Sequence, residues 1–267
     1  MTVTTKIQLY QVDAFTDTLF KGNPAAVCPL AEWLPDDLMQ AIAAENNLAE
    51  TAFFVGGQGQ FKVRWFTPAA EVDLCGHATL ASGFVVFGFM DPARQALSFD
   101  SRSGPLSVTR QADDYLALDF PARPPRERIS SPALAEALGG RPQELWAGAR
   151  DYMAVYASED EVRALAPDME RLKRLDRMAV MVTAPGREAD FVSRFFAPKV
   201  GIPEDPVTGS SHCTLVPYWA ERLKRDTLRA HQVSARGGEL LCTARGERVG
   251  IAGRCVLYLR GTLDLEL

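Results

Sequence analysis

A glutamate, Glu50, lies where a polar stretch of the chain passes into an apolar one. The polar pair Asn46-Asn47 precedes it, and the apolar run Ala52-Phe53-Phe54 follows it. A carboxylate at such a boundary is either solvated, as most glutamates are, or partly buried, where it can hold and donate a proton. Glu45 falls at the end of a helical pattern and is expected to face solvent. Glu50 is therefore the candidate acid/base residue.

Two turns of small residues each precede an apolar helical stretch. Residues 73–77 lead into a predicted helix at 78–90, and residues 204–211 lead into one at 214–223. The first of these helices is apolar nearly all round, which is typical of burial on every face. A helix start offers unpaired N–H groups and the positive end of the dipole, so two starts facing one cleft would bind a carboxylate. The alternative is ordinary capping by Ser210 or Ser211.

Two side chains beside these turns have chemistry of their own. His77 could cap its helix or pack in the core, as lone histidines usually do, or it could share a proton with a substrate. Asp205 precedes Pro206, and Asp-Pro is a common turn starter. The residues alone leave both alternatives open.

The segments that carry these turns occur twice, at an offset of roughly 130 residues. Residues 64–68 (RWFTP) are echoed by residues 194–198 (RFFAP), and each copy leads into one of the turns. Upstream, a strand, a helix and a strand are predicted in both halves, at 25–28, 35–45 and 51–55 and again at 153–156, 159–166 and 178–182. This order favours an internal duplication.

The remaining pattern is one of short strands. They are predicted at 7–12, 61–65, 97–101, 106–110, 115–120, 232–235, 248–252 and 255–260. The proline-rich segment 121–125 is the natural linker. Many short strands with one apolar helix in each half predict an α+β protein rather than alternating parallel β-α units.

Composition excludes several classes of protein. The 267 residues are 47% hydrophobic, enough for one large domain or two ordinary ones, and the net charge is −5 without a basic stripe, which disfavours a nucleic-acid partner. There is neither an apolar signal core nor a run of about 18 apolar residues, so no membrane association is expected. The five cysteines and three histidines show no ligand-pair spacing, which predicts free thiols in the cytoplasm and no metal.

Five segments together resemble the phenazine-biosynthesis PhzF family. In the family's order they are residues 11–15 (QVDAF), 22–27 (GNPAAV), 47–51 (NLAET), 75–80 (CGHATL) and 204–210 (EDPVTGS). The resemblance implies the diaminopimelate-epimerase fold, with two pseudo-symmetric domains, each a mostly antiparallel β-sheet or barrel wrapped around a central α-helix. The domains are then expected at 1–120 and 121–267, with the active-site cleft between them.

The resemblance also implies an activity. The family is similar to trans-2,3-dihydro-3-hydroxyanthranilate isomerase, which works without cofactor or metal, so the expected function is an acid/base proton shift on a small cyclic or unsaturated carboxylate by a homodimer. The resemblance assigns the catalytic role to Glu50. It assigns substrate contacts to the side chains of His77, Asp205 and Ser210 and to the backbone at Gly76 and Gly209.

Two other functions stay open. Related epimerases and racemases use two opposed cysteines, because inverting a stereocentre needs a base on each face. Cys75 occupies the first such position, but residues 205–208 contain no cysteine and Cys213 lies further on, which disfavours that chemistry. A non-catalytic metabolite-binding protein is the third candidate. The sequence does not name the substrate or its pathway.

Overall fold

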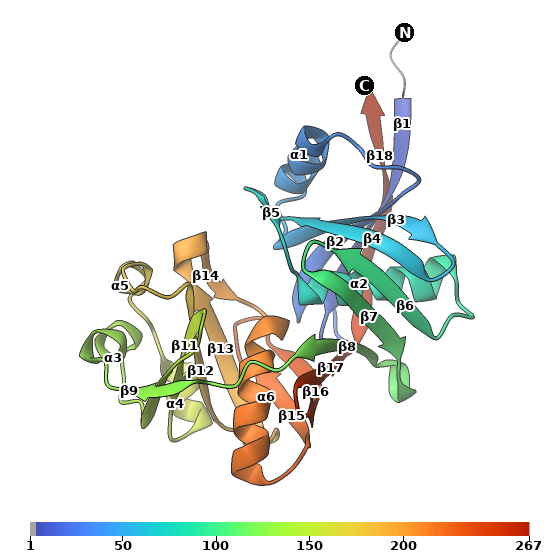
Figure 1. Cartoon of the computed structure of the whole chain (residues 1–267). Coiled ribbons are helices and arrows are strands. Elements are labelled where there is room, and N and C mark those ends of the chain that lie inside the picture. The colour runs from blue at the N-terminus through green and yellow to red at the C-terminus, as the bar shows by residue number, and fades with distance from the viewer. Residues whose placement is uncertain (1–3, 267) are drawn as a thin grey trace. The chain divides into compact units, whose positions relative to one another are not determined.

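The computed structural model describes residues 4–266, and it is an α+β protein as predicted (Figure 1). The chain divides into two compact units. The first holds residues up to Asp119 and those from Ala252 onward, and the second holds Phe120–Ile251. Among the described residues, no helix is both long and apolar enough to cross a membrane.

The C-terminal strand belongs to the first unit rather than to the predicted second half, 121–267. Strand β18 (Cys255–Glu266) pairs antiparallel with β1 (Thr4–Ala14) along its whole length. The internal duplication holds no information about this strand, because its partner lies at the opposite end of the chain. The first unit is therefore closed by the two ends of the sequence.

The first unit is built from short strands and two α-helices. After β1 come β2 (Asn23–Leu30), α1 (Asp36–Asn46), β3 (Glu50–Gly57), β4 (Gln60–Phe66), β5 (Glu71–Val72), α2 (Gly76–Val85), a π-helical turn (Val86–Met90), β6 (Ala96–Ser101), β7 (Gly104–Arg110), a 3₁₀ turn (Ala112–Asp114) and β8 (Leu116–Pro121). The strands β1, β2, β3, β4, β6 and β7 are neighbours in that order; β2–β3 and β4–β6 are parallel and the other pairs antiparallel. Strand β5 adds to β4, and β8 to β7.

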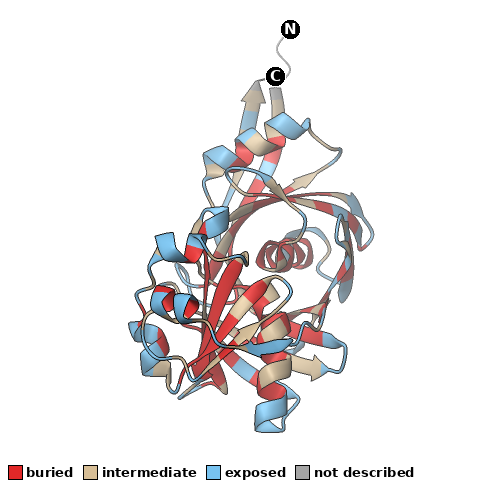
Figure 2. Cartoon of the chain, turned by 60° about the vertical axis from the view of Figure 1, so that its left-hand side comes forward, coloured by how far each residue is buried: buried red, intermediate tan, exposed pale blue. Residues whose placement is uncertain are grey.

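Helix α2 is the core of this unit. It packs against β1, β2, β3, β7 and β18, and all its residues except Gly76 and Phe84 are buried. Figure 2 shows this helix, buried on every side, enclosed by strands. Gly83 allows α2 to lie close to β7, because a Cβ at residue 83 would stand 2.7 Å from Cγ1 of Val108 in that strand. An apolar surface all round is what such an enclosed helix requires.

The second unit repeats this plan. Its elements are β9 (Glu127–Ile129), α3 (Pro132–Leu138), β10 (Glu144–Ala147), β11 (Asp151–Val155), α4 (Glu159–Ala164), α5 (Met169–Lys173), β12 (Ala179–Pro185), β13 (Phe191–Ala197), a 3₁₀ turn (Pro198–Val200), β14 (Ile202–Asp205), α6 (Gly209–Leu223), β15 (Thr227–Gln232), β16 (Gly238–Arg245) and β17 (Arg248–Gly253). The strands β10, β11, β12, β13, β15 and β16 are neighbours in that order, with β11–β12 and β13–β15 parallel and the other pairs antiparallel. This is the pairing of the first unit, which confirms the predicted pseudo-symmetry.

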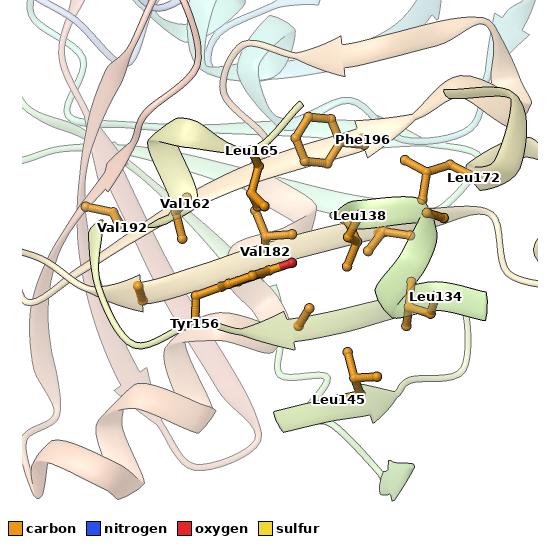
Figure 3. Packing of buried hydrophobic residues seen from close by; sticks show 14 of the residues in the cluster. Leu134, Leu138, Leu145, Tyr156, Val162, Leu165, Leu172, Val182, Val192 and Phe196 are labelled. Carbon is orange, nitrogen blue, oxygen red and sulfur yellow. The ribbon is translucent and has the colours of Figure 1, made fainter. Parts of the chain in front are cut away.

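A hydrophobic cluster holds the short helices of the second unit on its sheet. Leu134 and Leu138 of α3, Val162 of α4 and Leu172 of α5 are buried against strand residues that include Val182 (Figure 3). The short helices and the strands therefore share one core. Helix α6 packs separately against β15 and β16.

An arginine–glutamate pair occurs at the same place in both units. Arg64 of β4 donates through Nε and Nη2 to the carboxylate of Glu71 in β5, at 2.7 and 2.8 Å. Arg194 of β13 donates in the same way to Glu204 in β14, at 2.8 and 2.9 Å. Each two-bond pair, which we call a fork, joins the strand that leads into α2 or α6 to its neighbouring strand. The two forks account for the arginine repeated in the sequence.

Candidate active site

Glu50 and His77 meet in the first unit. Glu50 is the first residue of β3 and His77 the second residue of α2, which packs on that strand. His77 Nε2 lies 3.1 Å from Glu50 Oε2, and the two side chains are only 6% and 12% exposed. The two atoms do not meet the geometry of a hydrogen bond, and neither has another hydrogen-bond partner. Buried polar atoms rarely stay without a hydrogen-bond partner. Both atoms are therefore available to form a hydrogen bond with a substrate.

The other ring nitrogen of His77 faces two buried groups. Nδ1 lies 3.3 Å from Asn23 Nδ2 and 3.5 Å from Cys75 Sγ. Burial raises the pKa of the Cys75 thiol to about 11, so this group is neutral at physiological pH. Asn23 and Cys75 therefore hold the imidazole ring from the side opposite Glu50.

The protonation of His77 is set by two opposed effects. Burial disfavours the charged imidazole, but the neighbouring Cys75 and the carboxylate of Glu50 both favour it, and the pKa of His77 is raised above its ordinary value. A protonated His77 would be the ion-pair partner of Glu50, with Nε2 and Oε2 3.1 Å apart.

Glu50, Cys75 and His77 are also residue types that bind zinc. Their ligand atoms lie within 4.8 Å of one another, a grouping that sequence spacing does not reveal because Glu50 lies on β3 and the other two residues lie at the start of α2. The thiol lies beside Nδ1, however, and the carboxylate beside Nε2. Contacts on opposite ring nitrogens form a chain of polar groups rather than a ligand set that converges on one ion.

The turn before α6 is braced by a buried glutamine. Gln232 of β15 accepts from the Thr208 backbone N–H at 2.8 Å and donates to the Asp205 carbonyl at 2.7 Å. The Asp205 carboxylate accepts from the Thr208 hydroxyl at 2.5 Å. Gly209 and Ser210 follow at the start of α6. Asp205 thus supports the shape of this turn, whatever else it contacts.

Neither α2 nor α6 is capped by a side chain. The residues before them, Cys75 and Thr208, make no capping hydrogen bond. By contrast α3, α4 and α5 are each capped by a serine or aspartate side chain. Ser210 instead accepts from Arg150 Nη2 at 3.0 Å, and Ser211 donates to the Thr208 carbonyl at 2.8 Å. The alternative that Ser210 or Ser211 caps α6 is therefore wrong, and both helix starts keep amides that an anion could bind.

The predicted site residues thus form one group in each unit. Glu50, Gly76 and His77 lie at the start of α2 and β3, and Asp205, Gly209 and Ser210 lie at the start of α6. Glu45, the neighbouring carboxylate, is exposed as expected.

Sequence reasoning missed three polar residues of these groups: Asn23, Arg150 and Gln232. Asn23 begins β2 and Arg150 precedes β11, its counterpart in the duplication, and each contacts the start of its unit's main helix. Extending the duplication to these strand starts could have found both. Gln232 offered no signal in the sequence.

Comparison with known proteins identifies the family. The model of the family described as phenazine biosynthesis-like protein, PhzC-PhzF, matches residues 12–261. The chain belongs to this family. It is 53% identical over 260 residues to an uncharacterized isomerase of Pseudomonas aeruginosa, covering 97% of this chain and 100% of that protein.

Solved structures show the same fold. A PhzF-family phenazine biosynthesis protein from Enterococcus faecalis superposes with a TM-score of 0.94 at 49% identity, covering 98% of this chain and 100% of that one. A hydroxyproline epimerase from Agrobacterium vitis superposes with a TM-score of 0.63 at 12% identity, covering 100% and 95%. This second likeness concerns the fold alone, and it confirms the predicted epimerase-like architecture.

Proposed function

We propose that the protein is a cofactor-independent isomerase that shifts a proton on a small cyclic or unsaturated carboxylate. The observation that carries this proposal is the buried pair of Glu50 and His77 at the uncapped start of α2. Membership of a family whose relatives are named isomerases supports the reaction class. The reaction resembles that of trans-2,3-dihydro-3-hydroxyanthranilate isomerase.

In this mechanism Glu50 carries the proton. Its carboxylate removes a proton from one carbon of the substrate, and the resulting carboxylic acid returns the proton to another carbon on the same face, so that a double bond moves. His77 Nε2 lies 3.1 Å from Glu50 Oε2 and orients the carboxylate. Because the site is largely buried, the proton would be retained between the two steps rather than lost to water.

The helix starts are proposed to hold the substrate carboxylate. The backbone N–H groups near Gly76 and near Gly209-Ser210 lack side-chain caps and suit an anion. That both groups serve one substrate, in a cleft between the units, remains a prediction. A homodimer and a cytoplasmic location likewise remain predictions, the first testable by light scattering.

An epimerase is the second candidate, because Cys75 lies beside His77. Such a reaction needs a second base on the opposite face of the carbon. Cys213 could supply one only if its thiol were accessible. It is buried on α6, its Sγ directed to the Gly209 carbonyl at 3.8 Å, and burial raises its pKa to about 11. This geometry disfavours a two-thiol epimerase.

Proton exchange with solvent separates the candidates. The protein is incubated in D₂O with cyclic unsaturated carboxylates and the products are followed by NMR. Deuterium at carbon with a displaced double bond supports the isomerase. Inversion of a stereocentre without double-bond movement would support the epimerase instead, and ligand binding without any exchange would indicate a metabolite-binding protein.

A further inference from the structure

The second unit contains an arginine-lined pocket beside the start of α6. It is formed by residues 122–126, by residues 148–151 and by Ser210 and Thr214 on the first turns of α6, and its volume is about 440 Å³. Pockets of this size accommodate small organic ligands. Every residue that lines it belongs to the second unit.

Two of its arginines have no counter-charge. Among the residues that the structure describes, the guanidinium groups of Arg123 and Arg126 make no ion pair or hydrogen bond. The third arginine, Arg150, is neutralised by Asp151, with Nη2 and Oδ2 at 2.7 Å. The lining therefore carries a net charge of about +2.

The backbone holds these arginines at the pocket. The Arg123 N–H donates to the Cys213 carbonyl of α6 at 2.8 Å, and the Arg126 N–H donates to the Ala147 carbonyl at 3.2 Å. The linker segment is thus tied to both walls, although the two side chains are exposed. Because their backbone is fixed, the two arginine side chains would lose mainly side-chain conformational entropy when they converge on a bound anion.

The pocket adjoins the proposed substrate turn. Arg150 Nη2 donates to the hydroxyl of Ser210 at 3.0 Å, and Ser210 belongs to both the pocket and the uncapped helix start. A ligand group in the pocket would therefore lie close to a carboxylate bound at Gly209-Ser210. A guanidinium group can bind a carboxylate or a phosphate through two parallel hydrogen bonds.

We propose that this pocket binds a second acidic group of the substrate, held by Arg123 and Arg126. The natural substrate is then a molecule with two acidic groups, such as a cyclic dicarboxylate, rather than a monocarboxylate. This inference rests on the proposed function for the assignment of Ser210 to substrate binding. It goes further in naming the substrate class and two residues that select it.

The test compares two ring carboxylates that differ by one acidic group. Binding of benzoate and isophthalate to the full chain is measured by calorimetry at low ionic strength. We expect isophthalate to bind about tenfold more tightly or better, the gain of one charge-assisted contact, and added salt to reduce the difference. Equal affinities for the two compounds would overturn the proposal.

Variants test whether the pocket arginines cause the tighter binding of isophthalate than of benzoate. The double substitution Arg123→Ala/Arg126→Ala should remove the preference, and Arg123→Lys/Arg126→Lys should keep part of it. The matched control is Arg141→Ala/Arg174→Ala, which removes two exposed arginine charges of the same unit from outside the pocket and should leave the preference intact. Loss of the preference in the control, or its survival in the pocket alanine variant, would overturn the proposal. Because these are binding measurements, the preference can stand even if no deuterium exchange is found, in which case the proposed function alone fails.

Discussion

Removing one fork should destabilise the protein more than removing an exposed ion pair. Arg194 makes four hydrogen bonds, two to the Glu204 carboxylate and two to the carbonyls of Val162 and Leu165 at 3.1 and 2.8 Å. The arginine and glutamate side chains are only 13% and 24% exposed, so solvent screens the pair weakly. Arg194→Met would leave a partly buried carboxylate and two carbonyls without these partners, at an expected cost of about 2–4 kcal/mol.

The assay is urea unfolding followed by tryptophan fluorescence, with Arg187→Met as the matched control. Arg187 pairs with Asp160, and these side chains are 64% and 66% exposed, so its loss should cost less than about 1 kcal/mol. Arg64→Met in the other fork should behave like Arg194→Met, because Arg64 and Glu71 are 17% and 15% exposed. If both fork variants cost no more than the control, the forks do not fix the strands that lead into α2 and α6.

Three further outcomes are expected. Burial lowers the pKa of His212 to about 4, so below about pH 6.5 the unfolded chain binds a proton at this residue and the native chain does not. The free energy of unfolding should therefore fall by about 3 kcal/mol as the pH drops from 6.5 to 4. The fall should be smaller in His212→Asn. Cys75, whose pKa burial raises to about 11, should react with iodoacetamide at pH 7.5 only after unfolding in urea, which mass spectrometry can follow. His77→Asn and Asp205→Asn should reduce turnover less than Glu50→Gln does, because both are assigned to positioning; larger losses in kinetic assays would contradict that assignment.

The sequence predicted the architecture well because the fold is used twice. The repeated RWFTP and RFFAP segments form the ends of β4 and β13 and the residues just after them, and the strand–helix–strand order around them recurs in the pairing of both units. Strand β18 could not be placed, since its pairing with β1 joins residues at opposite ends of the chain. The predicted strand at 232–235 was wrong, because β15 ends at Gln232 and a turn around Gly237 follows it.

Two helices differ from what the sequence predicted. Helix α6 starts at Gly209, before the predicted 214, because its first residues form helices poorly in isolation but are held by burial of Ser211 and His212. Helix α3 was missed although its start carries a readable signal, Ser131 as cap followed by Pro132. In both cases tertiary packing or local capping outweighed the hydrophobic pattern.

The candidate residues of the site could be named from the sequence, but their contacts could not. Glu50 and His77 come together because β2 and β3 run parallel and α2 packs across both, which no local spacing reveals. The Arg150–Ser210 bond joins residues 60 positions apart for the same kind of reason.

The most direct test of the central claim is the deuterium exchange catalysed by Glu50→Gln beside that of Glu45→Gln. Each variant is incubated in D₂O with the carboxylate that the wild-type chain isomerises, and deuterium at carbon is measured by NMR. Glu50→Gln should keep the fold and ligand affinity but lose exchange by about 10²–10⁴-fold, because the amide has the same shape and cannot take the proton. Glu45→Gln, at an exposed position, should exchange at the wild-type rate. Full exchange in Glu50→Gln would contradict the account, since the proton would then be carried by another group.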